Sequence, residues 1–204
     1  TATFTPGRDA ARKEASKLNV PRIGVRFRLP ASMNQVEYFG RGPAENYLDR
    51  NAGSMVGLYK STAEELYFPY VRPQENGHHT DTRWVSLSTG KKGLLIQADN
   101  TIGFNALRNS IEDFDDEEAT GLPRQWSNFT PEQVANHDEA AAKNVLRRQH
   151  HINDITPRDF VEVCVDLKQQ GVAGYDSWGS RPEPAYTLPA NREYNWGFTL
   201  IPLK

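Results

Sequence analysis

The sequence has little of what several common classes of protein require. Its single cysteine, Cys164, excludes an intrachain disulfide framework, and within VEVCVDL it is predicted to be a small core residue rather than a nucleophile. No apolar run approaches the roughly 20 residues that a membrane-spanning helix needs. The net charge of -2 gives no basic surface for a nucleic acid. We therefore expect neither membrane insertion nor nucleic-acid binding.

Motifs of common catalytic and metal sites are missing as well. There is no nucleophile elbow, phosphate-binding loop or zinc-ligand spacing. The acidic run 112–118 (EDFDDEE) lacks the glycine and spacing of a calcium loop, and is interpreted as a solvated loop. Adjacent histidines, at 78–79 and again at 150–151, point to opposite faces of an extended backbone and are poor partners for one ion. We predict no metal site in this chain.

What is present is an alternation of apolar and polar residues with a period of two, which is typical of half-buried β-strands. It is clearest at 22–29, 161–168 and 194–200, and shorter candidates lie at 36–39, 56–59, 84–87 and 94–98. The 15 glycines and 13 prolines separate these segments. Because no long helices alternate with the strands, the pattern disfavours a TIM barrel or a doubly wound sheet and favours an antiparallel sandwich.

One short helix is predicted near Thr130, because Thr130, Pro131 and Gln133 match an N-cap, a first helical residue and a capping box. Residues 8–17 (RDAARKEASK) suit a loose helical turn or a flexible connector. We expect residues 1–20 to be a strand remnant with a flexible connector, and 21–204 to be one β-sandwich domain. Since the chain opens with TATFTPGRD, it is expected to be a piece of a longer polypeptide.

Two loops gather polar side chains that admit two interpretations. Glycines and prolines shape both loops, GRGPAENYLDR and PYVRPQENGHHTDTRW. Their candidate residues are Glu45, Asn46 and Asp49 in the first loop and Glu75 and Asn76 in the second. These groups either satisfy one another within structured turns, or contact a ligand.

A third loop, GYDSWGS at residues 174–180, is the strongest candidate for function. Trp178 lies between small, flexible residues and outside any periodic strand, and binding groups concentrate on such loops. An indole face is a good surface for the C–H-rich face of a sugar. The alternative is an indole tucked against the sandwich. Trp84 and Trp196 lie in strand-like runs, where core packing is expected.

Four phrases together resemble the last domain of the β-galactosidases of glycoside hydrolase family two. They are PRIGVRFRLP at 21–30, YFGRGPAENYLDR at 38–50, PYVRPQENG at 69–77 and DSW at 176–178. The resemblance extends from about residue 20 to the end. It implies a large antiparallel supersandwich similar to galactose mutarotase, here without its first strands and so incomplete.

The resemblance also implies a function. Such enzymes are multidomain, are commonly homo-oligomeric, and hydrolyse terminal β-D-galactosides with retention. Their catalytic glutamates belong to a TIM-barrel domain that this chain lacks, and they commonly use Mg and Na through other domains, so no cofactor and no catalytic residue is expected here. Retention requires two carboxyl groups about 5 Å apart, and the sequence singles out no such pair.

Trp178 matches the tryptophan that the family's terminal domain contributes to the substrate pocket, and Asp176 and Ser177 are expected to shape its loop. The expected partners are a galactoside and the other domains of the parent enzyme. The alternatives are a free-standing carbohydrate-binding or aldose-epimerase-like module, and a domain with a purely structural role. The compartment, cytoplasm or periplasm, stays open.

Overall fold

The computed structural model describes residues 2–5, 19–114, 152–176 and 178–204. The chain divides into two compact units: Thr1–Phe68, Asn76–Asn109 and Pro157–Lys204 form the first, and Pro69–Glu75 and Ser110–Thr156 the second. The helix predicted near Thr130, most of the predicted connector, and Ser177 lie outside the described residues.

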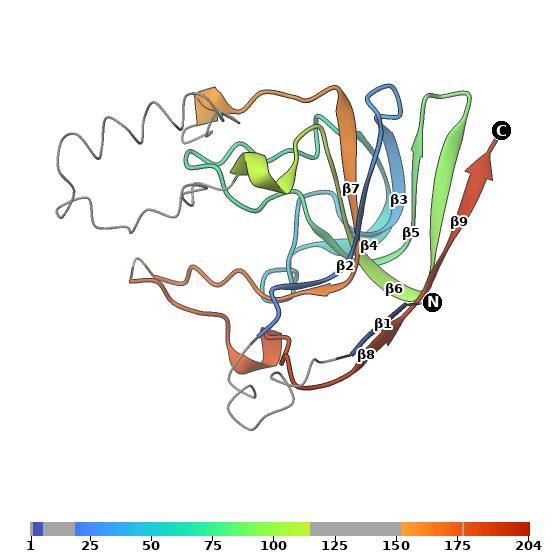
Figure 1. Ribbon diagram of the computed structural model, residues 1–204. Coiled ribbons are helices and arrows are strands. Elements are labelled where there is room, and N and C mark those ends of the chain that lie inside the picture. Colours follow the sequence, from blue (N-terminus) through green and yellow to red (C-terminus); the bar gives the residue numbers. More distant parts are fainter. Residues whose placement is uncertain (1, 6–18, 115–151, 177) are drawn as a thin grey trace, which may run out of the picture. The chain divides into compact units, whose positions relative to one another are not determined.

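The described strands all belong to the first unit, and every pairing between them is antiparallel (Figure 1). They are β1 (Ala2–Phe4), β2 (Arg22–Pro30), β3 (Gln35–Gly42), β4 (Met55–Thr62), β5 (His79–Ser88), β6 (Gly93–Leu107), β7 (Phe160–Gln169), β8 (Tyr194–Trp196) and β9 (Phe198–Leu203). A seven-stranded sheet has the order β2-β7-β6-β5-β3-β4, with β9 paired to β6, and β1 pairs with β8. The predicted all-β, antiparallel fold is confirmed.

The described helical segments are three short 3-10 turns: η2 (Ile111–Phe114), η4 (Ile152–Asp154) and η5 (Pro184–Tyr186). None of the described helices has the length and apolar character to cross a membrane. In η2, Asp113 is buried and accepts a hydrogen bond from the Ser110 amide at 2.9 Å. The interpretation of the acidic run as a solvated loop is therefore wrong at this residue, because local hydrogen bonding favours its burial.

The core of the sheet follows the period-two pattern in its central strands. In β3, Val36 and Tyr38 are buried while Gln35 and Phe39 are exposed. The small β1–β8 pair is joined to the large sheet through a cluster in which Tyr194 packs with Ile23 and Leu188. Alternating apolar side chains thus supply the buried area that drives this packing.

In β7 the same pattern is misleading, because both faces of the strand are buried. Residues 161–166 are all covered, including the polar Glu162 and Asp166. Glu162 pairs with Arg28 at 3.0 Å, and Asp166 pairs with Arg22 at 3.0 Å. Arginines of the neighbouring strand β2 therefore cover a face that was predicted to be exposed to solvent. Their ion pairs offset the free-energy cost of burying the two carboxylates.

Two further segments differ from their predicted form. In β2 the alternation does not set burial: Ile23 is buried while Val25 is 39% exposed. The pairing of β2 with β7 also shifts register between Ile23 and Gly24. The run 194–200 is two strands, β8 and β9, which separate at Gly197 and join different partners (Figure 1). Trp84 and Trp196, expected in the core, are only half-buried.

Candidate functional site

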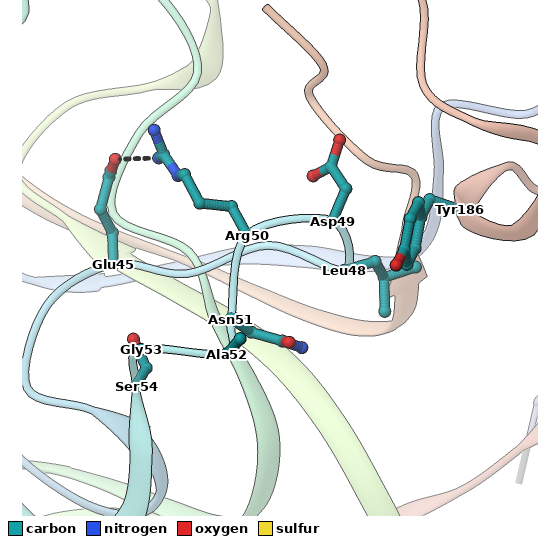
Figure 2. A pocket seen from close by; sticks show the side chains of 9 residues that line it. All are labelled: Glu45, Leu48, Asp49, Arg50, Asn51, Ala52, Gly53, Ser54 and Tyr186. Atoms are coloured by element: carbon teal, nitrogen blue, oxygen red, sulfur yellow. Dashed lines mark hydrogen bonds and ion pairs between the residues drawn. The ribbon is translucent and has the colours of Figure 1, made fainter. Parts of the chain in front are cut away.

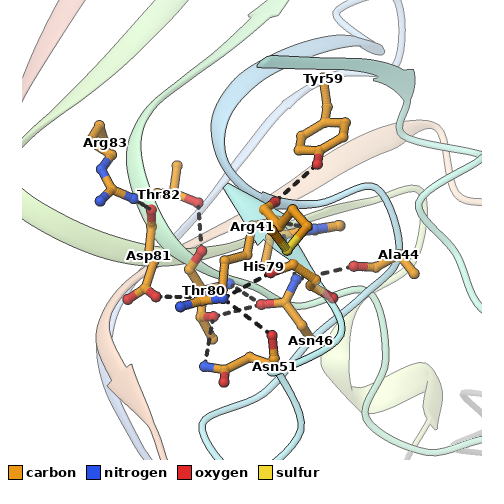
Figure 3. A network of polar contacts seen from close by, with 12 residues as sticks. Arg41, Ala44, Asn46, Asn51, Tyr59, His79, Thr80, Asp81, Thr82 and Arg83 are labelled. Atoms are coloured by element: carbon orange, nitrogen blue, oxygen red, sulfur yellow. Dashed lines mark hydrogen bonds and ion pairs between the residues drawn. The ribbon is translucent and has the colours of Figure 1, made fainter. Parts of the chain in front are cut away.

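The turn after β3 is built around Asn46, whose side chain is fully buried. Its amide nitrogen donates to the carbonyls of Arg41 and Ala44, both at 3.1 Å. Its amide oxygen accepts hydrogen bonds from the amide and the hydroxyl of Thr80 in β5, at 2.9 and 2.6 Å (Figure 3). All the hydrogen-bonding groups of this amide are therefore used within the fold, which matches the interpretation of a self-satisfied turn for Asn46.

Glu45 ties the first polar loop to the second. One carboxylate oxygen lies 2.6 Å from the guanidinium of Arg50, and the other accepts a hydrogen bond from the Gly77 amide at 2.6 Å. In the second loop, Asn76 is buried and accepts a hydrogen bond from the Phe68 amide at 3.2 Å. The Glu45–Gly77 hydrogen bond thus joins the two polar loops.

The adjacent histidines point into different surroundings, as predicted. His78 stacks on Tyr47, with ring centroids 5.5 Å apart, and its Nδ1 lies 2.7 Å from the Asn105 side-chain oxygen. His79 packs against Phe104 at 5.1 Å and Tyr38 at 4.9 Å.

Both imidazoles are neutral at pH 7. Burial, together with the nearby charge of Arg22, lowers the pKa of His78 to about 3, and burial lowers the pKa of His79 to about 4. Within the described residues, no group of three or more His, Cys, Asp or Glu side chains is placed to hold a metal ion. The two rings are therefore buried packing residues beneath the polar loops.

Trp178 is 93% exposed, on a segment that connects η5 to β7. Its amide donates to the Asp176 carboxylate at 2.7 Å, and the Tyr175 amide donates to the Ser180 hydroxyl at 3.0 Å. Gly179 has a φ of +81°, which suits glycine. The indole is thus presented to solvent by a locally hydrogen-bonded turn, and the alternative of a tucked-in indole does not describe this structure.

Asp49, the third polar residue of the first loop, contacts the segment that leads to Trp178. Its Oδ1 accepts a hydrogen bond from the Val172 amide at 3.1 Å. Its Oδ2 accepts from the Ala173 amide at 2.8 Å and from the Tyr175 hydroxyl at 3.2 Å. The structure therefore brings together two candidate segments that are more than 120 residues apart in the sequence.

A pocket of about 460 Å³ lies next to these groups (Figure 2). It is lined by Glu45, Leu48, Asp49, Arg50, Asn51, Ala52, Gly53, Ser54 and Tyr186. The Glu45–Arg50 ion pair and the ring of Tyr186 lie on either side of Asp49 in the view of Figure 2. A few convergent polar groups beside an aromatic ring are typical of small-molecule sites.

Sequence reasoning missed Tyr186, because PEPAY carries no motif. Its backbone carbonyl accepts a hydrogen bond from the Gly171 amide at 2.8 Å, which places it beside the Asp49 contacts. An aromatic residue in a proline-rich stretch after the Trp178 loop was the one available signal.

Comparison with known proteins identifies the family. A family model described as beta galactosidase small chain matches residues 2–200. The chain belongs to this family. The prediction from the four phrases is confirmed, and the small-chain match includes both polar loops and Trp178.

Individual relatives of this small chain are β-galactosidases. That of Priestia megaterium is 35% identical over 185 residues, which cover 90% of this chain and 15% of that protein. That of Arthrobacter sp. strain B7 is 40% identical over 111 residues, covering 52% of this chain and 11% of that protein. That of Vibrio cholerae is 29% identical over 181 residues, covering 89% and 14%. The small chain spans at most 15% of the length of these relatives.

Proposed function

We propose that this chain is the carbohydrate-binding terminal portion of a β-galactosidase that hydrolyses terminal β-D-galactosides with retention. In this proposal Trp178 forms an aromatic wall of the substrate pocket. The two catalytic carboxylates belong to a TIM-barrel domain outside this chain. The observation that carries the proposal is the 93% exposure of the Trp178 indole on a hydrogen-bonded turn.

Physical chemistry supports a ligand at this indole. A fully exposed tryptophan leaves a large apolar surface in water, and covering that surface is favourable. A galactoside offers one C–H-rich face for stacking and hydroxyl groups for hydrogen bonds. The polar pocket beside Asp49 and Tyr186 supplies donors and acceptors of the kind that hydroxyl groups require.

The proposal assigns the remaining parts of catalysis to other domains of the parent enzyme. Those domains would hold the acid/base and nucleophile glutamates and the magnesium and sodium ions. The small share of the relatives' length that this chain covers supports such a division. The parent enzyme is further proposed to be a homo-oligomer.

Kinetics of Trp178→Ala in the full-length parent enzyme test the proposal. Loss of a stacking contact of on the order of 1–2 kcal/mol predicts a rise in KM of roughly tenfold. The change should fall mainly on binding, since the stack is made in both the ground state and the transition state. Trp178→Phe keeps an aromatic face and should recover part of the loss.

A matched control is Leu58→Ala, which removes an apolar side chain that is 58% exposed on β4 and should leave KM unchanged. Thermal unfolding is measured on the same variants. A purely structural role for Trp178 would instead lower the melting temperature and leave KM alone. An unchanged KM for every galactoside tested contradicts the proposed wall.

A further inference from the structure

The carboxylate of Asp49 accepts every one of its three cross-loop hydrogen bonds from the segment before Trp178. The donors are the amides of Val172 and Ala173 and the hydroxyl of Tyr175. An ionised carboxylate is an acceptor only, so its chemistry matches three donors that converge on it. Hydrogen bonds to an ionised group are stronger than those between neutral groups. The contact is therefore suited to hold a loop in one place.

The backbone of this segment is shaped for that contact. A Cβ atom at Gly171 would lie 2.4 Å from Oδ2 of Asp49, so the close approach requires glycine. Ala173 has a φ of +54°, which a residue with a side chain rarely adopts, and Gly174 follows with a φ of +80°. Such a bend points neighbouring amides toward one anion. The unfavourable conformation at Ala173 is offset by the bonds that the bend allows.

Beyond Tyr175 the turn is held by its own side chains. The Trp178 amide donates to Asp176, and the Tyr175 amide donates to Ser180. In the described part of the chain, the hydrogen bonds that join residues 172–178 to elements other than their own turn all end on Asp49. Together with the Gly171–Tyr186 hydrogen bond just before it, this carboxylate therefore sets the position of the turn relative to the pocket lining.

We propose that Asp49 is a positioning residue for galactoside binding: its carboxylate fixes the turn from which the Trp178 indole projects. It acts through the loop and does not itself need to touch the sugar. This inference rests on the function proposed above, since it assumes that the place of the indole matters for binding. In this inference the position of the Trp178 loop is fixed by Asp49, and not by Asp176 or Ser177 alone.

The test uses Asp49→Asn and Asp49→Ala in the full-length parent enzyme. Asn keeps the size of the side chain but replaces one acceptor oxygen with an NH₂ group that faces donors, so it carries the test if Asp49→Ala does not fold. Hydrogen exchange of the Val172 and Ala173 amides should become at least about tenfold faster. Asp99→Asn, which alters an exposed carboxylate on β6, is the matched control and should change nothing.

Kinetics provide the readout that a general structural defect would not give. KM should rise in Asp49→Asn by no more than in Trp178→Ala, with kcat largely kept. In the double variant Asp49→Asn/Trp178→Ala, KM should equal that of Trp178→Ala alone, because a misplaced loop without its indole loses nothing further. Additive increases in KM would show that Asp49 acts independently of Trp178 and would overturn the inference.

Two other results also overturn it. Unchanged exchange at Val172 and Ala173 in Asp49→Asn would show that the carboxylate does not hold the loop. Faster exchange with an unchanged KM, in an enzyme whose Trp178→Ala variant has a raised KM, would show that the loop's position is unimportant. If Trp178→Ala itself leaves KM unchanged, the proposed function fails, and the exchange data then report separately on whether Asp49 holds the turn.

Discussion

Lowering the pH should reduce the stability of the region that contains the two polar loops, because His78 and His79 are buried and neutral in the folded protein. Burial, with the charge of Arg22, lowers the pKa of His78 from its ordinary value of 6.5 to about 3, and burial lowers that of His79 to about 4. When this region opens, each imidazole is protonated below pH 6.5, whereas in the closed form it is not. The open state thus binds more protons from pH 6.5 down to about pH 4 for His79 and about pH 3 for His78, and stability falls as the pH falls across that window.

The size of the effect follows from the two pKa values. Between pH 7 and pH 5, an open-state imidazole of pKa 6.5 is stabilised by about 2 kcal/mol relative to one that stays neutral in the closed state. If one opening event exposes both histidines, the free energy of opening should fall by about 4 kcal/mol between pH 7 and pH 5. That is a large fraction of the 5–15 kcal/mol typical of a domain.

Hydrogen exchange of the Thr80 amide reports this opening, since the amide adjoins His79 and donates to the Asn46 side chain at 2.9 Å. The assay compares the full-length protein at pH 7 and pH 5 after correction for the intrinsic exchange rate. In His79→Gln, which cannot titrate, the fall in opening free energy should be about half as large. An opening free energy that is the same at both pH values would refute the reasoning, and an undiminished fall in His79→Gln would assign it to other groups.

Two further predictions follow from the described contacts and from the sequence. Gly103→Ala should destabilise the sheet by roughly 1–3 kcal/mol, because the new Cβ would lie 2.5 Å from the His78 ring, whereas Gly53→Ala, with nothing within 4 Å, should be nearly neutral in the same thermal unfolding assay. The isolated polypeptide should not cleave a chromogenic β-galactoside, because its sequence singles out no pair of carboxyl groups of the kind that retention requires. Galactose-inhibitable turnover by the highly purified polypeptide would contradict that expectation.

Local pattern predicted the strands well but not the faces that they bury. Alternation located the segments that became β3, β5 and β6, because side-chain period is a property of each strand alone. It failed where a partner strand decides the outcome. Glu162 and Asp166 read as solvent-facing, yet arginines of β2 cover them. Gly197 reads as one position in a continuous strand, yet it separates two strands that pair with different sheets.

The candidate site shows the same division. The phrases that carry the family resemblance contain Asp49 and Trp178, so both could be selected as candidates from the sequence. Their connection could not, because hydrogen bonds across 123 to 126 residues leave no trace in local spacing. Tyr186 was missed for a related reason: it becomes part of the pocket only through the path of the backbone after the Trp178 loop.

Three neighbouring side chains in the turn after β3 join it to the rest of the fold, two to the second polar loop and one to the segment before Trp178. Asn46 binds Thr80 of β5, Glu45 binds the amide of Gly77, and Asp49 binds the segment before Trp178. Asn46 and the Glu45 carboxylate are buried, so losing either leaves an unsatisfied polar group inside the fold and costs stability. Asp49 is only half-buried, so its loss exposes donors that water can reach. The same turn therefore separates two tasks: Asn46 and Glu45 maintain the fold, while Asp49 can set the position of an exposed loop with little effect on the stability of the sheet.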